Sequence, residues 1–200
     1  WGFRFFIWAR FLWQVSRIEL KLVPTHPDRL AGLGFLSNSV QALAVFAAAH
    51  GTLLAGYLAT RIVILGAPLT QFKAEIAIMV VLVLCMALGP LLVFVPQLAA
   101  ARRTGLRKYG GLAMRYVSEF EAKWLRTSAA KAETLVGSAD IQSLADMGNS
   151  YDIIRKMRTT PITMDAVQRL TAATLAPIVP LLITMMPMEE LVRKLAAILF

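Results

Sequence analysis

The chain has 200 residues, of which 58% are hydrophobic and 16% are charged, and its formal net charge is +9. Soluble domains average about 25% charged residues, so this composition predicts an integral membrane protein. In such a protein, excess Lys and Arg indicate cytoplasmic loops and anionic lipid headgroups, so we expect a lipid bilayer as partner and no nucleic acid. The single cysteine, Cys85, excludes an internal disulfide and a thiolate metal site.

Residues 1–23 are apolar and aromatic, with polar side chains recurring along one helical stripe. They predict either the end of a spanning helix or an amphipathic helix in the membrane interface. We favour the first because the aromatic residues surround the helix instead of occupying one face. The chain begins at Trp1 inside this segment, so we expect preceding residues that include at least one further membrane segment.

Residues 24–32 predict a turn at the membrane edge. Pro24 and Pro27 interrupt helical structure, and Asp28 stands where its carboxylate can cap the helix that follows. The tripeptide His26-Pro27-Asp28 also occurs in J-domain co-chaperones, but the preceding Pro24 and the Gly-rich, apolar sequence that follows do not fit that domain. We therefore interpret His26, Pro27 and Asp28 as a capped turn.

Residues 33–65 predict a membrane helix. The stretch from Leu33 to Thr60 has no charged residue and is long enough to cross a hydrocarbon core of roughly 30 Å. Its small and weakly polar residues share one stripe, which predicts close packing against another helix. This helix-packing face consists of Ser37, Gln41, Ala44, Ala48, Thr52, Ala55 and Ala59.

A second face of the same helix is polar and bulky. Its polar members are Ser39, His50, Tyr57 and Arg61. Because a polar ring that faces lipid is costly, His50 predicts a water-filled space or a protein neighbour. The alternative is a neutral His50 that donates one hydrogen bond to a carbonyl or hydroxyl group of a packed neighbour.

Two further apolar segments, residues 76–98 and 166–188, predict membrane helices interrupted by proline. Proline removes a backbone donor, so each of these helices is expected to kink or unwind, and the second to bend or re-enter the membrane. Residues 189–200 then predict an amphipathic tail. The positions expected to break the helices are Gly89, Pro90, Pro96, Pro177 and Pro180.

Residues 102–165 are polar and predict a small helical cytosolic subdomain. Gly110-Gly111 is expected to bound one of its amphipathic helices, and Asp140 to cap another. The block opens with basic residues, which the positive-inside rule places on the cytoplasmic side as contacts for anionic lipid headgroups. These residues are Arg102, Arg103, Arg107 and Lys108.

Three strings, HPDRLAGLGFL at 26–36, DIQSLADMGNS at 140–150 and PIVPLLITMMPMEEL at 177–191, carry a likeness to known proteins. The chain resembles an uncharacterised family of bacterial polytopic inner-membrane proteins. Ala31 stands where this resemblance leads us to expect a glycine. The resemblance implies a location in the bacterial inner membrane and implies no activity. The helical periodicity and the distribution of Lys and Arg predict an all-α polytopic membrane protein with residues 102–165 in the cytoplasm.

No phosphate-binding loop, metal-ligand pair or catalytic triad is evident, so we expect neither an enzyme nor a cofactor or metal site. Two functions remain. The first is a channel or transporter subunit in which the proline-broken helices line a cavity near His50. The second is a membrane-anchored interaction or scaffold subunit that presents its cytosolic helices to a partner. Both predict a homo-oligomer or a subunit of a larger membrane complex.

Overall fold

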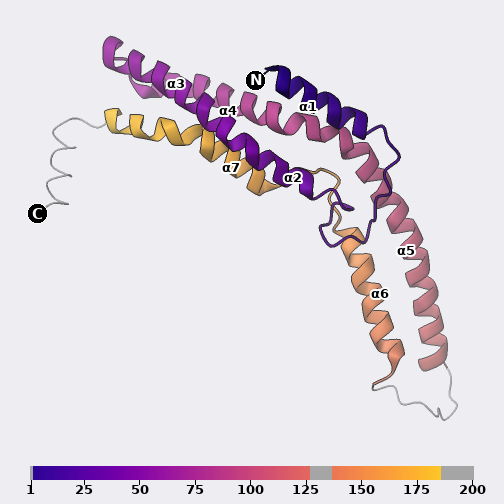
Figure 1. Ribbon diagram of the computed structural model, residues 1–200. Helices are drawn as coiled ribbons and strands as arrows, with labels where there is room; N and C mark the ends of the chain where they lie inside the picture. Colours follow the sequence, from indigo (N-terminus) through magenta and orange to yellow (C-terminus); the bar gives the residue numbers. More distant parts are fainter. Residues whose placement is uncertain (1, 127–136, 186–200) are drawn as a thin grey trace, which may run out of the picture. The chain divides into compact units, whose positions relative to one another are not determined.

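The computed structural model describes residues 2–126 and 137–185 (Figure 1). Within these residues the chain forms α-helices and 3-10 helices and no strand, which confirms the all-α fold class. Two helical segments, Phe35–Leu65 and Leu69–Trp124, are long and apolar enough to cross a membrane, judged by length and composition only. The predicted tail at 189–200 lies outside the described residues. The chain divides into two compact units.

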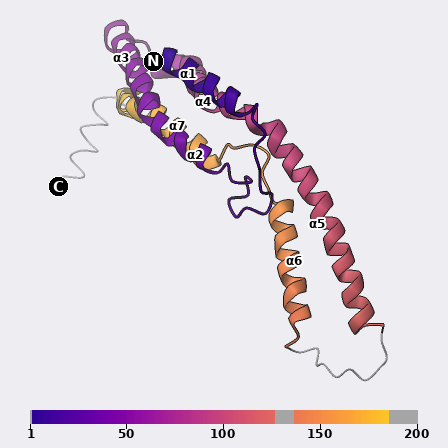
Figure 2. The same ribbon diagram turned by 45° about the vertical axis from the view of Figure 1, so that its right-hand side comes forward.

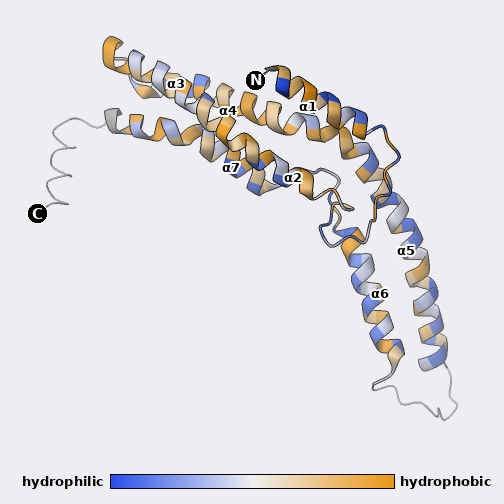
Figure 3. Ribbon diagram, in the orientation of Figure 1, coloured by the Kyte–Doolittle hydropathy of each residue, from blue (hydrophilic) through white to orange (hydrophobic). Residues whose placement is uncertain are grey.

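The first unit combines residues 36–90 with the chain from residue 162 onward, together with the first five residues. In it α3 lies alongside α7 and its continuation η4, and α4 also contacts α7 (Figures 1 and 2). Hydrophobic residues dominate α3 and α4 (Figure 3). Its elements are α2 (Phe35–Ser39), η1 (Val40–Leu43), α3 (Ala44–Leu65), η2 (Leu69–Phe72), α4 (Lys73–Leu88), α7 (Met164–Leu175) and η4 (Ala176–Met185).

The approach of α3 to α7 depends on Gly51. A Cβ atom added at Gly51 would collide with the main-chain carbonyl oxygen of Thr174 on α7. Ala47 and Ala55 lie one turn to either side of Gly51, and both are buried. The three positions form a seam of small residues spaced four apart, a pattern that lets two helix backbones pack closely.

This seam corrects the predicted helix-packing face. Ser37 and Ala55 of that face are buried, but Gln41 and Thr52 are exposed. The sequence contains an equally periodic stripe through Ala47 and Gly51, which lie one position before Ala48 and Thr52 of the predicted stripe, and the two stripes share Ala55. Periodicity alone does not distinguish two neighbouring small-residue stripes, whereas the glycine marks the position where no side chain fits.

The turn between α3 and α4 is built by Gly66 and a small core. Gly66 adopts the left-handed conformation, with φ of 65°, and its N–H donates to the carbonyl of Ile62, which ends α3. Beyond it, Leu58, Leu69 and Phe72 form a buried cluster that joins the end of α3 to η2. The predicted helix at 33–65 therefore ends at its expected residue.

The prolines alter helical geometry without ending the helical path. The stretch Gly89–Phe94, which contains Pro90, is a 3-10 helix between α4 and α5. Pro96 lies in the first turn of α5, where its missing N–H leaves no carbonyl unpaired. Pro177 and Pro180 lie in the 3-10 helix η4. The tighter 3-10 winding accommodates the lost α-helical donors.

The second unit contains α5 (Val95–Trp124), α6 (Ala139–Arg155), the part of α1 (Gly2–Val15) from Phe6 onward, and the loop that follows α1. Helices α5 and α6 run side by side as an antiparallel hairpin (Figures 1 and 2). Gly105 is a point of close approach on α5, because a Cβ atom there would lie 2.7 Å from Pro24 Cβ and 3.1 Å from Ile154 Cγ2.

Two boundaries predicted for this unit are wrong. The helix expected over 1–23 ends at Val15, where the Gln97 side chain donates to the carbonyls of Ser16 and Ile18 at 2.6 and 3.1 Å. Those carbonyls would otherwise accept bonds within a continuing helix. Gly110-Gly111 does not bound a helix and lies inside α5, where the Tyr151 ring of α6 packs near Gly110.

We predict that Gly51→Ala lowers stability while Gly56→Ala does not. The new methyl group at position 51 meets a main-chain carbonyl that cannot rotate away, and overpacking of this kind costs about 1–3 kcal/mol. Gly56 lies on the same helix with no atom near its missing Cβ, so alanine there removes only backbone freedom. Thermal unfolding in detergent micelles measures both; equal melting temperatures for the two variants would contradict the α3–α7 seam.

Candidate functional site

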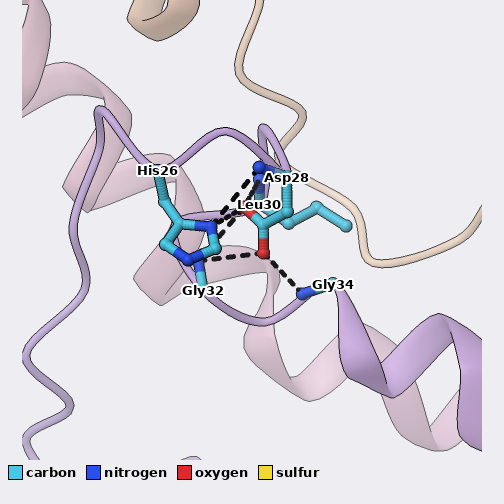
Figure 4. A network of polar contacts seen from close by, with 5 residues as sticks. All are labelled: His26, Asp28, Leu30, Gly32 and Gly34. Atoms are coloured by element: carbon cyan, nitrogen blue, oxygen red, sulfur yellow. Dashed lines mark hydrogen bonds and ion pairs between the residues drawn. The ribbon is translucent and has the colours of Figure 1, made fainter.

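Several main-chain donors surround the Asp28 carboxylate (Figure 4). Its Oδ1 accepts from the N–H of Leu30 at 2.8 Å, and its Oδ2 accepts from the N–H of Gly34 at 2.9 Å. The N–H of Gly32 reaches both oxygens, at 3.2 and 3.1 Å. The main-chain N–H groups of every second residue, at positions 30, 32 and 34, thus point toward one carboxylate. We call this arrangement the Asp28 cradle.

Backbone conformation produces the cradle. Arg29 and Ala31 have φ of 55° and 54°, and Gly32 has φ of 96°. Residues in the left-handed region between ordinary ones turn successive N–H groups toward a common point, which makes a concave site for an anion. A left-handed residue other than glycine costs roughly 1–2 kcal/mol. Ala31, where a glycine was expected, therefore stores strain that the hydrogen bonds of Asp28 offset.

His26 supplies a further contact to the cradle. Its Nδ1 lies 2.9 Å from Asp28 Oδ1 and 3.3 Å from the Asp28 main-chain nitrogen. A proton on Nδ1 makes it a donor to the carboxylate, whereas a bare Nδ1 accepts from the Asp28 N–H. The His26 ring is half exposed and covers the solvent side of the cradle. It can bond either to the Asp28 carboxylate or to the Asp28 main-chain N–H, depending on which ring nitrogen carries the proton.

Hydrogen bonding controls the acidity of Asp28. Partial burial alone raises its pKa, but the N–H groups of Leu30, Gly34 and Gly32, with His26, more than compensate. The pKa of Asp28 is therefore lowered from its usual value of 3.8. The three N–H groups donate to the ionised carboxylate and stabilise it relative to the protonated acid.

The turn that carries the cradle is fixed to the rest of its unit by the main chain. The Arg158 N–H, which follows α6, donates to the Arg29 carbonyl at 2.8 Å, and the Val23 N–H donates to Ala31 at 3.3 Å. This corrects the prediction that Asp28 caps a helix, because the next helix, α2, begins only at Phe35. The carboxylate organises a loop instead.

The predicted polar face of the membrane helix does not converge. His50 Nδ1 lies 2.9 Å from the Phe46 carbonyl one turn earlier, and its ring contacts the Phe46 ring in a tilted arrangement, with 4.0 Å between centroids. Ser39 donates to the carbonyl of Leu36 on its own helix. Intrahelical bonds of this kind satisfy polar groups locally and need no water-filled space.

Tyr57 and Arg61 form a separate pair nearer the end of α3. The Arg61 guanidinium lies over the Tyr57 ring, 5.3 Å from its centroid, and both residues are exposed. They line a hollow of about 280 Å³ with Thr60, Ile64 and Leu65, and His50 is not part of it. An aromatic ring with a cation at the end of an apolar helix is typical of a membrane interface.

The four basic residues predicted to contact lipid have different roles. Arg102 donates through Nη2 to the carbonyl of Arg155 at 2.9 Å, which ties α5 to the end of α6. The other three, Arg103, Arg107 and Lys108, are exposed. Arg102 is therefore a structural contact of the hairpin, and the remaining three are free to meet a charged surface.

A second carboxylate site closes the other end of the hairpin. Asp140 Oδ2 accepts from Lys123 Nζ at 2.6 Å and from Trp124 Nε1 at 2.9 Å, and the Tyr116 hydroxyl donates to the Asp140 carbonyl. The hydrogen bonds from Lys123 and Trp124 lower the Asp140 pKa. Sequence reasoning expected Asp140 to be a helix cap; no local pattern indicates partners on another helix. The cap position is Ser138.

Among the described residues, no group of His, Cys, Asp and Glu side chains is arranged to hold a metal ion. No protein-family model, no curated protein and no solved structure matches the chain. The function is therefore inferred from the residues and their geometry.

We predict that Asp28→Asn destabilises the fold by about 1.5–3 kcal/mol, because the substitution removes charged hydrogen bonds and turns an amide donor toward main-chain donors. Asp146→Asn is the matched control, since Asp146 is exposed and accepts only from Gln142 one turn away. Chemical unfolding followed by circular dichroism measures both. A loss for Asp28→Asn no larger than that of the control would show that the cradle is not a stabilising site.

The cradle also predicts an acid dependence. Since the pKa of Asp28 is lower when folded, its contribution is complete above the unfolded value of 3.8 and is lost as pH falls through the folded pKa below it. The melting temperatures of wild type and Asp28→Asn should therefore differ at pH 7, begin to converge as the pH falls below about 4, and meet only below the lowered folded pKa. A difference that stays constant over this range would contradict the charge-based account.

Proposed function

We propose that the chain is a polytopic protein of the bacterial inner membrane that anchors the α5–α6 hairpin on the cytoplasmic side as a docking module for an acidic protein partner. The observation that carries this proposal is the hairpin itself, a helix pair tied at both ends with its outer surface unpartnered within the described residues. The proposal rests also on two apolar segments long enough to span a bilayer.

The hairpin is held in a defined geometry. At one end Asp140 receives Lys123 and Trp124, and at the other Arg102 donates to the carbonyl of Arg155. Gly105 allows α6 to pack closely between these contacts. A surface that is ordered before binding loses less conformational entropy when a partner docks, which favours affinity.

The outer surface of the hairpin combines apolar and basic side chains. Exposed apolar residues are Leu112, Met114, Leu125 and Ile141, with exposed fractions from 42% to 74%. Arg115, Lys123 and Arg126 are exposed on the same hairpin, where Lys123 pairs with Asp140 and Arg126 with Glu121, whereas Arg115 has no ion pair among the described residues. Apolar anchors surrounded by charged residues are typical of protein interfaces, and the unpaired Arg115 favours an acidic partner.

The transport hypothesis has less support. It depended on two proline-broken helices and on a polar ring that needed water or a second neighbour, and the His50 ring has a hydrogen-bond partner and an aromatic neighbour in Phe46 of its own helix. We retain it as the alternative that a flux measurement decides.

Photo-crosslinking in native membranes tests the docking proposal. A photoreactive amino acid placed at Met114 or Leu125 should form one discrete protein adduct that weakens at high salt and in the charge-reversed variant Arg115→Glu. The same amino acid at Val45 or Val63, which are exposed on the apolar helix α3, is the matched control.

The proposal predicts no adduct of the same size at the control sites. Absence of an adduct at the hairpin, or an identical adduct at α3, would overturn it. In proteoliposomes the wild type should pass ions no faster than empty vesicles; a flux that falls in His50→Ala would establish transport instead.

A further inference from the structure

A groove of about 570 Å³ lies in the second unit between the loop after α1 and the first turns of α5. Both walls belong to the unit that contains the hairpin. Gln97 holds the walls together, since its Nε2 donates to the carbonyls of Ser16 and Ile18.

Its lining has two chemical halves. Lys21 from one wall and Lys108 from the other supply ammonium groups, and Thr104 supplies a hydroxyl group. No ion pair or hydrogen bond within the described residues occupies either lysine. The remaining lining is mostly aliphatic, from Leu20, Leu22, Ala100 and Ala101. Cationic donors beside aliphatic walls fit an amphiphile with an anionic head better than a free inorganic ion.

The charges of the lining residues further restrict the kind of anionic headgroup that fits the groove. Two lysines and the single carboxylate of Glu19 leave the groove with an excess of one positive charge. A phosphodiester carries one negative charge, and Glu19 is an acceptor that suits hydroxyl groups on the same headgroup. The groove also lies where an apolar segment gives way to a basic one, the level at which lipid headgroups lie.

We propose that this groove binds the headgroup of an anionic glycerophospholipid that bears free hydroxyl groups, the chemistry of phosphatidylglycerol. The proposal rests on the membrane location proposed above but not on the protein partner. Lys21 and Lys108 contact the phosphodiester from opposite walls, Thr104 donates a further hydrogen bond, and Glu19 accepts from the glycerol hydroxyl groups. The aliphatic lining contacts the first carbons of the acyl chains.

The test uses the full chain in an uncharged detergent, titrated with short-chain phosphatidylglycerol and followed by thermal shift and native mass spectrometry. Removing both lysines, as Lys21→Ala with Lys108→Ala, should raise the half-saturating lipid concentration roughly 25-fold, about fivefold for each charge. Arg103 and Arg107 are expected to meet the headgroups of a bilayer surface, but an uncharged detergent offers no such surface. The matched control, Arg103→Ala with Arg107→Ala, therefore removes two charges from exposed positions on α5 outside the groove and should change the half-saturating concentration little.

Three further ligands distinguish the sources of the same chemistry. Inorganic phosphate, glycerol 3-phosphate and short-chain phosphatidylethanolamine should each bind more weakly than phosphatidylglycerol. Equal binding of either phosphate would overturn the lipid assignment, and equal binding of phosphatidylethanolamine would overturn the charge selectivity. An equal loss of lipid affinity in the two double variants would show that positive charge attracts the lipid wherever it lies on α5, and would overturn the assignment of the groove as the binding site.

A second double variant distinguishes a folding defect from a loss of lipid binding. Lys21→Gln with Lys108→Gln repeats the test should the alanine pair lose helix content, because glutamine keeps the aliphatic stem. Weak lipid binding with an intact hairpin adduct would refute the groove alone. Strong, lysine-dependent lipid binding without a hairpin adduct would support the groove and refute the docking proposal.

Discussion

The three main-chain N–H groups that surround the Asp28 carboxylate are the interaction on which the second unit depends. They hold Arg29 and Ala31 in the left-handed conformation, which turns the chain from the loop after α1 toward α2. The same turn receives the Arg158 N–H from the segment after α6. Without the charged acceptor, three donors and two strained residues would be left uncompensated. A loop of this kind therefore needs an acid at position 28.

The same physical constraint explains the polar residues of the apolar helices. A polar group that loses water in apolar surroundings is costly unless it is hydrogen-bonded, so polar side chains on apolar helices bond within the protein. His50 bonds to Phe46, and Thr174 bonds to the carbonyl of Leu170. The Gln97 side chain similarly donates to the carbonyls of Ser16 and Ile18, which follow the end of α1. These three side chains thus bond to backbone carbonyls, and a polar residue in an apolar segment is not by itself a sign of a transport path.

Local rules predicted much of the fold and little of the site. The charge-free run and Gly66 were enough to place the helix at 33–65, and the prolines indicated where α4 gives way to 3-10 winding. The end of α1 at Val15 was not predictable, because Gln97 lies about eighty residues away in sequence. The sequence identified Asp28 as a turn residue. The positions of the N–H groups that it binds depend on the left-handed conformations of Arg29 and Ala31, which no sequence pattern predicted.

The central claim is that apolar helices in lipid anchor a hairpin that lies in water. Spin labels attached to cysteines at exposed positions measure this directly, through their collisions with apolar oxygen and with a water-soluble nickel complex, in a Cys85→Ser background. The account predicts that labels at Val45, Val63 and Ile78 collide mainly with oxygen, and labels at Met114 and Leu125 mainly with nickel. Hairpin labels that collide mainly with oxygen, or α3 labels open to nickel, would contradict it.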